Sequence, residues 1–425
     1  MTIQVLETLG IFSLTLFLIL RKPFGLHEAW GTVIGSVLML VFGLVSFSQS
    51  CQTVLEGASV LLFLLALMVL SALLDLAGFF EWAAILAARA CDGNGQKLYR
   101  NVFLLGAVTT AVLSLDTTAI ILTPIVVAFV QRLNLKAYPF LIACAFVANT
   151  GSLLFPVSNL TNLLFQEAFH YSFFSFTLFM LVPQLVALAL NYWLFKFLFR
   201  SSIPKTFDKS LLPDALSAVP DRLFFNGAVL IVAVVIVGYF VASLYRIHPV
   251  FVASIGAGFL LVWGAWRRQL DHRIWKDISW SLFPFVIGLF IVIRGVENIG
   301  LSNIAANMFV MADKQPLIQV PVIACATALG SNLINNIPMA LLAISALKHA
   351  HSNLLDQYSA LLGCNLGPNL TIAGSLATML VITSARKRGE NISAMDFLRI
   401  GLVATPVLVI GASIAAYCVG CLHID

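Results

Sequence analysis

Charged residues are scarce in this 425-residue chain, in which Asp, Glu, Lys and Arg make up 10% of the sequence. Soluble domains carry about 25% charged residues. Hydrophobic residues make up 60% of the chain and recur in long segments, which excludes both an ordinary soluble protein and a single-pass anchor. The longest polar stretch is 201–221, so no soluble domain is expected. We therefore predict an all-α polytopic membrane protein.

Several signatures of other protein classes are also missing. The seven cysteines are scattered, without metal-binding spacing, so we expect buried free thiols and neither a metal nor another cofactor. No nucleophile–base constellation points to an enzyme. The net charge of +5 reflects basic loops on one membrane side, not a nucleic-acid surface. The first apolar segment has no basic start and no small-residue cleavage site, so it is expected to remain as a span.

Twelve apolar segments divide the chain. Ten are predicted membrane spans, at about 4–20, 29–47, 54–77, 138–166, 174–199, 222–245, 249–266, 280–299, 356–385 and 397–421. The other two, 99–132 and 315–347, have polar centres and are predicted to be re-entrant hairpins. Residues 79–90 are expected to form an amphipathic interfacial helix, with 304–311 as a weaker counterpart.

The basic residues orient these segments. With the N-terminus outside, 20 of the 24 Lys and Arg residues are cytoplasmic, three are external, and Arg294 lies within a span. The first hairpin then opens from inside and the second from outside. Each half has five spans and one hairpin, which predicts an inverted repeat of 1–200 and 222–425 joined by a cytoplasmic linker at 201–221. Both termini are expected to lie on the external side of the membrane.

Two predicted spans are interrupted by helix-breaking and polar residues. The first contains NTGSLLFPVSN at 149–159, and the second contains NLGPNLTIAGS at 365–375. Asn149 and Asn365 are 216 positions apart, as are Gly151 and Gly367. Interrupted helices in corresponding halves indicate a transporter binding site. The alternative is a pair of kinked helices whose polar groups are satisfied locally.

The two hairpin tips are polar as well, with SLDTT at 114–118 and GSNLINN at 330–336. We expect these four segments to converge near mid-membrane. The candidate substrate-binding residues are Thr117, Thr118, Asn149, Ser152, Ser158, Asn159, Ser331, Asn332, Asn335, Asn336, Asn365, Asn369, Thr371 and Ser375. Amides and hydroxyls both donate and accept hydrogen bonds, and no Lys or Arg lies on the four segments. Such a site suits a small neutral polyhydroxylated solute better than a multivalent anion.

Asp116 is the sole carboxylate on these four segments and the first candidate for proton coupling. Desolvation favours its protonated form. The alternative role is a structural helix cap. Asp75 and Glu297 are the further proton-coupling candidates, although Arg294 and Glu297 are three positions apart and can form a structural pair. The seven histidines lie in loops or at segment ends, where we expect solvated side chains without a role.

With these residues in view, the chain closely resembles the bacterial arsenite efflux permeases of the ArsB family, in the ion transporter superfamily. The resemblance covers essentially the whole length and both halves. It rests on LLDLAGFFEWAA (73–84), AIILTPIV (119–126), VSNL (157–160), NNIP (335–338), GCNLGP (363–368) and GSLAT (374–378). It implies export of arsenite and antimonite, as neutral hydroxides, in exchange for protons, and an optional arsenite-stimulated cytoplasmic ATPase as partner.

This chain departs from the family pattern at three positions. The family often has Asp where this chain has Asn149 and Asn365, and Lys where it has Asn369. Losing these charges together keeps the site neutral and leaves Asp116 as the main proton candidate. Without these charged residues, the number of protons exchanged per substrate need not be that of the rest of the family.

Two other transport functions remain open from the residues. One is a sodium-coupled anion carrier of the same superfamily, but such carriers typically show Ser-Asn-Thr at both tips, and Asp116 would repel an anion. The other is a channel, although carbonyl-lined filters usually need several equivalent loops.

Overall fold

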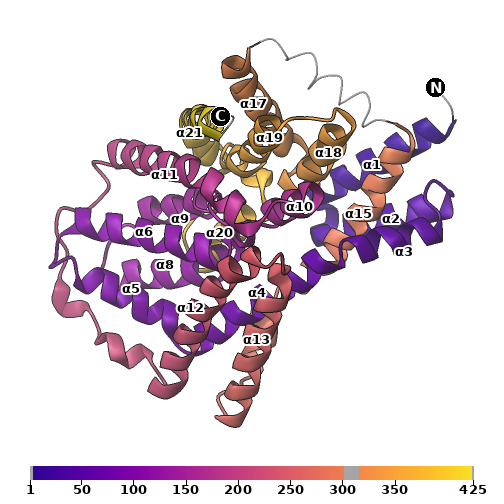
Figure 1. The fold of residues 1–425 in the computed structure, drawn as a ribbon. Helices are drawn as coiled ribbons and strands as arrows, with labels where there is room; N and C mark the ends of the chain where they lie inside the picture. The colour runs from indigo at the N-terminus through magenta and orange to yellow at the C-terminus, as the bar shows by residue number, and fades with distance from the viewer. Residues whose placement is uncertain (1–2, 301–314, 424–425) are drawn as a thin grey trace.

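The computed structural model describes residues 3–300 and 315–423, and within these ranges every regular element is helical (Figure 1). An isolated bridge joins Asn94 and Thr206. The all-α fold is therefore confirmed. The longer helices are α1 (Ile3–Arg21), α2 (Glu28–Val41), α3 (Phe47–Glu56), α4 (Ala58–Leu76), α5 (Phe79–Arg89), α6 (Gly95–Val112), α8 (Thr123–Arg132), α9 (Tyr138–Thr150), α10 (Leu160–Phe169), α11 (Phe173–Leu198), α12 (Arg222–Leu244), α13 (Pro249–Trp266), α15 (Leu282–Asn298), α17 (Pro316–Ile334), α18 (Asn336–His349), α19 (Leu354–Leu366), α20 (Leu376–Lys387) and α21 (Ala394–His423).

Short helical elements connect or interrupt the longer helices. They are η1 (Pro23–Gly25), α7 (Leu115–Thr117), η2 (Thr118–Leu122), η3 (Pro156–Ser158), η4 (Lys209–Leu211), η5 (Ala215–Ala218), α14 (Arg273–Asp277), η6 (Gly367–Asn369) and η7 (Ile372–Gly374). Eight helices of the described residues are long and apolar enough to cross a membrane, and α2 and α9 are shorter apolar helices. The chain is thus a multi-pass membrane protein.

Each of the ten predicted spans contains a helix, but the second ends earlier than predicted. Helix α2 ends at Val41, and Gly43 adopts a positive φ of 66° that a side chain would disfavour. A capping box between Ser46 and Gln49 then starts the separate helix α3. The prediction of one continuous segment over 29–47 was wrong because this local turn chemistry outweighs the apolar composition.

Both predicted hairpins consist of two helices that meet at a polar break. In the first, α6 ends at Val112 and helical structure resumes at α7, whose N-terminus is capped by the Ser114 side chain. In the second, α17 and α18 meet at Asn335, whose φ is 77°. Pro338 lies in the first turn of α18, and Pro124 in the first turn of α8 after η2, positions where a missing N–H costs little.

Helix α5 is amphipathic, and protein covers its apolar face. Phe80, Ala84 and Ile85 are buried against neighbouring elements, which include α4, α6, α8 and η5 of the linker. The Arg89 guanidinium donates to the Pro213 carbonyl of the linker at 2.9 Å. The helix at 79–90 thus forms, and it binds the linker between the halves. Its predicted counterpart at 304–311 lies outside the described residues.

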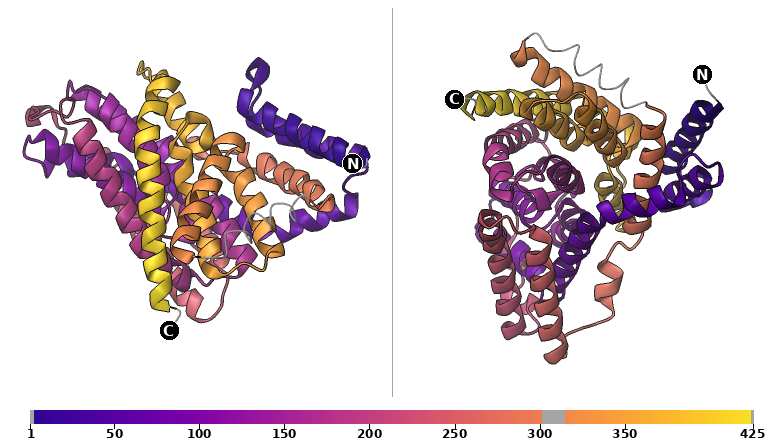
Figure 2. Two further views of the ribbon diagram at one scale, coloured as in Figure 1. Left: turned by 90° about the horizontal axis from the view of Figure 1, so that it is seen from above. Right: turned by 45° about the vertical axis from the view of Figure 1, so that its right-hand side comes forward.

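The apolar interior is divided into two cores. The larger extends through both halves, whereas a small second core joins α1, α2 and α15 through Phe12, Met39 and Val292. Figure 2 shows the indigo helices α1 to α3 at one side of the molecule. Helices α1, α2 and α15 thus share this small core, while Ile19, Ala29 and Phe285 of the same helices belong to the larger one.

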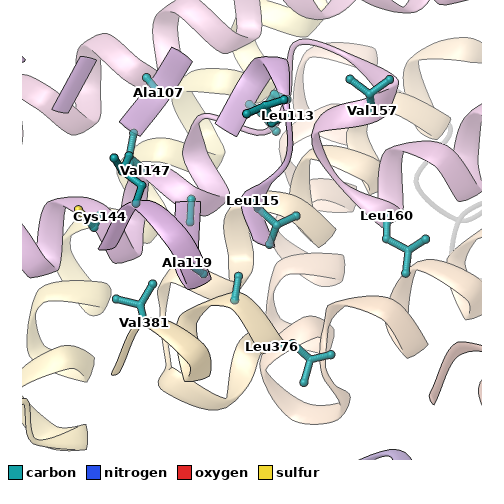
Figure 3. Packing of buried hydrophobic residues seen from close by; sticks show 14 of the residues in the cluster. Ala107, Leu113, Leu115, Ala119, Cys144, Val147, Val157, Leu160, Leu376 and Val381 are labelled. Carbon is teal, nitrogen blue, oxygen red and sulfur yellow. The ribbon is translucent and has the colours of Figure 1, made fainter. Parts of the chain in front are cut away.

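The first hairpin lies against both halves of the molecule. Element η2 contacts α9 of its own half and α20 of the other. Figure 3 shows Ala119 of η2 beside Val147 and Cys144 of α9 and Val381 of α20. The hairpin tip is consequently held where the two halves meet.

Close helix packing at Gly363 holds the second hairpin against α19. A Cβ atom there would lie 2.0 Å from Thr327 Oγ1 and 2.1 Å from the Ala324 carbonyl oxygen, both on α17. Backbone atoms that approach this closely require glycine, as in other membrane helix pairs.

We predict that Gly363→Ala separates α17 from α19 and destabilises the protein by about 1–3 kcal/mol through overpacking. Thermal unfolding of the detergent-purified protein should show a lower midpoint. The matched control is Gly258→Ala in α13, where an added Cβ meets nothing within 4 Å. That variant should unfold at or above the wild-type midpoint, because alanine favours helix. Equal midpoints for the two variants would contradict the packing argument.

Candidate functional site

Two broken helices with the same local structure lie at the centre of the molecule. One consists of α9, η3 and α10, and the other of α19, η6, η7 and α20. The bounds of η3 and η7 differ by 216 positions at both ends. Asn159 and Ser375, also 216 apart, are both extended N-caps, of α10 and α20 respectively, and each caps with its side chain. The sequence offset therefore marks a repeat of backbone conformation.

The first amide network forms around Asn149, at the end of α9. Its Nδ2 donates to Asn369 Oδ1 and to Thr378 Oγ1, both at 3.0 Å. Its Oδ1 accepts from the Ser375 hydroxyl at 3.2 Å. Asn369 Nδ2 in turn donates to Thr150 Oγ1 at 3.1 Å. We call these five residues the Asn149 network, and all are 0% exposed.

The second amide network forms around Asn365, at the end of α19. Its Oδ1 accepts from Asn159 Nδ2 at 3.0 Å and from the Thr161 hydroxyl. Its Nδ2 donates to Asn162 Oδ1 at 2.6 Å. Asn159 Nδ2 also lies 3.2 Å from Ser152 Oγ, which it reaches across the first break. We call these residues the Asn365 network.

The two networks are related by the same offset. Asn149 pairs with Ser375 and Thr378 of the other half, and Asn365 pairs with Asn159 and Asn162 of the other half. Each of the three corresponding positions, 149 and 365, 159 and 375, 162 and 378, differs by 216. The amides of Asn149 and Asn365 therefore have partners across the halves, in addition to the local bonds that Asn162 makes to the Ser152 and Phe155 carbonyls.

Freed backbone groups at the breaks also find partners. Gln184 of α11 accepts from the Leu153 N–H at 2.8 Å and donates to the Thr150 carbonyl at 2.9 Å. Helix α21 approaches the second break at Gly401, where a Cβ atom would lie 2.4 Å from the Leu370 carbonyl oxygen. Buried backbone groups without such partners would cost several kcal/mol each in an apolar environment.

Hydroxyl groups fix the tip of the first hairpin. Thr117 is hydrogen-bonded to Ser71 of α4 at 2.8 Å and to Ser114 at 3.0 Å. Thr118 is hydrogen-bonded to Thr110 of α6 at 2.7 Å. Ser158 of η3 donates to the carbonyl of Ala111 at the end of α6, at 2.6 Å. The tip thus contacts the first break, while Thr117 and Thr118 lie outside both amide networks.

The tip of the second hairpin is bonded to the second break. Asn332 Nδ2 donates to the Gly367 carbonyl at 2.8 Å, and Asn332 Oδ1 accepts from Thr371 at 2.8 Å. Asn335 Nδ2 donates to the Ala373 carbonyl at 3.2 Å. Ser331, by contrast, donates to Thr327 within its own helix. Asn336 Oδ1 is buried and lacks a hydrogen-bond partner among the described residues.

Asp116 lies at the first hairpin tip between two cavities. One of about 100 Å³ is also lined by Glu28, Ser281 and Leu380, and a smaller one of about 10 Å³ is lined by Thr117. Within 3–300 and 315–423 the Asp116 carboxylate has no hydrogen bond or ion pair. The structural cap role is filled by Ser114, whose hydroxyl accepts from the Thr117 N–H at 3.1 Å. Asp116 is thus left accessible to small solutes or water.

The other predicted proton-coupling candidates lie away from the amide networks. Asp75 is in the last turn of α4. Glu297 pairs with Arg294 at 3.3 Å, as the three-residue spacing indicated, and both line a cavity of about 830 Å³. In the predicted topology this cavity opens on the external side. The side chains that line it include Glu56, Glu167, Lys348 and His349.

Histidine and cysteine side chains differ in part from the sequence expectation. His248 Nε2 lies 2.8 Å from Glu167 Oε2 and joins α13 to α10, and His27 Nδ1 caps α2. Both side chains nevertheless remain solvent-exposed as expected, at 50% for His27 and 37% for His248. All seven cysteines are free, but Cys51, Cys418 and Cys421 are exposed and only Cys91, Cys144 and Cys364 are buried.

Sequence reasoning missed four polar members of the networks and Gln184. Asn162 and Thr378 lie three positions after the N-caps Asn159 and Ser375, a spacing that the sequence contains but that the prediction did not use. Thr150 and Thr161 flank predicted residues. Gln184 had a signal too, because it is a lone amide inside an apolar span.

Comparison with known proteins covers nearly the whole chain. The family model described as ArsB, arsenical pump membrane protein, matches residues 7–418. The arsenical pump membrane protein of Yersinia enterocolitica is 31% identical over 411 residues, with 94% of this chain and 95% of that protein covered. The protein of the same name from Escherichia coli K12 is also 31% identical over 411 residues, with the same coverage.

A solved structure shares the fold. The YdaH transporter of Alcanivorax borkumensis, reported to have an unusual topology, aligns with a TM-score of 0.62 at 15% identity, with 98% of this chain and 99% of that chain covered. That likeness supports the polytopic helical architecture. The family match and the relatives at 31% identity go further. The chain belongs to the ArsB family of arsenical pump membrane proteins and is a membrane transporter for arsenicals.

Proposed function

We propose that this protein exports arsenite and antimonite, as neutral hydroxides, from the cytoplasm in exchange for protons. The observation that carries the proposal is the composition of the centre. Buried amides and hydroxyls from both halves converge there without Lys or Arg on the four segments, and Asp116 is their single carboxylate. The proposed substrate-binding residues are the fourteen predicted from the sequence, extended by Thr150, Thr161, Asn162 and Thr378 of the networks.

The chemistry of the substrate fits these groups. Arsenious acid is a trihydroxide that is neutral at cytoplasmic pH, and each hydroxyl both donates and accepts hydrogen bonds. The carboxamides and hydroxyls of the networks have the same dual capacity. Asn149 and Asn365 already bond to partners in the opposite half, so binding replaces protein–protein hydrogen bonds by protein–substrate bonds. Such an exchange yields a modest affinity, which suits a carrier that must release its substrate.

Proton coupling is assigned to Asp116. A carboxylate within the membrane is costly and functional by default. This one lines a cavity of about 100 Å³ that lies on the cytoplasmic side in the predicted topology. Protonation and deprotonation of Asp116 would accompany the change of access. Asp75 and Glu297 are secondary candidates. Glu297 forms an ion pair with Arg294, and Asp75 lies at the end of α4, away from the amide networks.

The membrane arrangement is part of the proposal. The protein resides in the bacterial inner membrane with both termini periplasmic, the halves 1–200 and 222–425 form an inverted repeat, and the two hairpins are re-entrant. The distribution of Lys and Arg and the matching amide networks support this arrangement. The family resemblance adds an optional cytoplasmic ATPase.

The first test concerns Asp116. We expect Asp116→Asn to abolish arsenite transport driven by a pH gradient in vesicles that contain only this protein, because an amide does not exchange the proton. Exchange of arsenite without a gradient should largely persist. Asp208→Asn, in the exposed part of the linker, is the matched control and should behave as wild type. Undiminished uphill transport by Asp116→Asn would move the role to Asp75 or Glu297.

A second test concerns the charge of the substrate. Single changes Asn159→Ala, Asn332→Ala or Asn336→Ala should raise the half-saturating arsenite concentration about two- to tenfold, because one neutral hydrogen bond contributes about 0.5–1.5 kcal/mol. The pH dependence of transport should remain that of the wild type. Initial rates over a range of arsenite concentrations measure both quantities.

The same flux assay distinguishes the proposal from a sodium-coupled anion carrier. Arsenate, succinate and citrate should not compete with arsenite, and removal of sodium should leave the rate unchanged. Strong competition by any of these anions at neutral pH would show that the site binds charge. The chain would then be a carrier for anions as well as a member of its family.

A further inference from the structure

A second carboxylate, Glu28, shares the larger Asp116 cavity although it lies 88 positions earlier in the chain. Glu28 is the first residue of α2, and its side chain is 10% exposed. The other lining residues come from α15 and its preceding turn, namely Ser279, Ser281, Leu282 and Phe285, and from α20, namely Leu376 and Leu380, together with His27. The cavity therefore brings together residues of four separate helical elements.

The position of the Glu28 carboxylate is fixed by two neighbours. Lys22 Nζ lies 2.6 Å from Glu28 Oε2, and His27 Nε2 lies 3.5 Å from Glu28 Oε1. The other ring nitrogen of His27, Nδ1, accepts from the Ala29 N–H at 3.4 Å, which leaves Nε2 to donate towards Glu28. Among the described residues that line the cavity, the titratable groups are His27, Glu28 and Asp116.

The cavity also joins segments that are far apart in the chain. Helices α2 and α15 contact each other, and the α15 residues Leu282 and Phe285 belong to the same large core as Leu376 of α20. A volume of about 100 Å³ has room for several water molecules, since one molecule occupies about 30 Å³ in the liquid. Polar groups that line this cavity can thus be connected through water.

We propose that Glu28 is the cytoplasmic proton acceptor for Asp116, an inference that rests on the proposed proton coupling. Asp116 releases its proton to cavity water and becomes a carboxylate, and Glu28 takes up a proton from the same water and becomes neutral. Glu28 then returns that proton to the cytoplasm at the Lys22 and His27 end of α2. Water is neither consumed nor formed, and one proton moves per cycle of the pair.

The test uses the full-length protein in vesicles with an imposed pH gradient, with arsenite flux and internal pH followed together. Glu28→Gln should slow gradient-driven arsenite flux by about tenfold, because relayed proton transfer contributes at least that much. Arsenite exchange without a gradient should be retained. The dependence of the driven rate on cytoplasmic pH should flatten. Glu81→Gln, an exposed carboxylate of α5, is the matched control and should keep the wild-type profile.

Two further variants separate a relay from a structural ion pair. Lys22→Met removes the ion pair but keeps the carboxylate, so it should reduce the driven rate less than Glu28→Gln does. Ser281→Leu fills the cavity without touching the pair, and it should slow driven flux while exchange persists. It also provides the test if Glu28→Gln fails to accumulate in the membrane.

Distinct outcomes separate this inference from the proposed function. Equal losses in Glu28→Gln and Lys22→Met, or full driven rates in Glu28→Gln or Ser281→Leu, would overturn the relay. In each of those cases, gradient-driven flux by the wild type would still support the proposed proton coupling. If the wild type itself shows no gradient-driven flux, the proposed proton coupling fails first.

Discussion

A helix that breaks inside an apolar environment must find hydrogen-bond partners within the protein, and this requirement organises the molecule. Both breaks expose backbone groups that water cannot reach. Gln184 satisfies two of them at the first break, and Asn332 binds a carbonyl at the second. Asn149 and Asn365 meet the same requirement for side chains by pairing across the halves. The contact between the halves is therefore polar at its centre and apolar around it.

The two breaks match in backbone conformation, but the hairpin tips beside them differ in chemistry. Gly78 and Gly300 end corresponding helices with positive φ angles of 84° and 74°, and η3 and η7 have equivalent positions. The hairpin tips differ, since the first has Asp116 and hydroxyls while the second has three asparagines. The two tips thus present a carboxylate in one case and amides in the other, although the breaks beside them have matching backbone conformations.

Much of this architecture could be predicted from the sequence, because apolar length and helix breakers are local signals. The two broken helices and Asn149, Asn159, Asn365 and Asn369 were predicted on that basis. Their partners Asn162 and Thr378 were not predicted, since these two residues resemble ordinary helix positions until the other half is placed beside them. Glu28 was missed for the same reason, because its neighbour Asp116 is distant in sequence. The end of α2 depends on a turn that composition does not reveal.

The mutual bonding of the asparagines has a consequence for leakage. Under the proposed function, the donors and acceptors that cargo would use are occupied by the opposite half when cargo is absent. Cargo then competes with the protein's own asparagines for these groups. The proposed proton coupling would thereby be protected from an idle cycle, because a solute with several hydroxyl groups is needed to replace these bonds together.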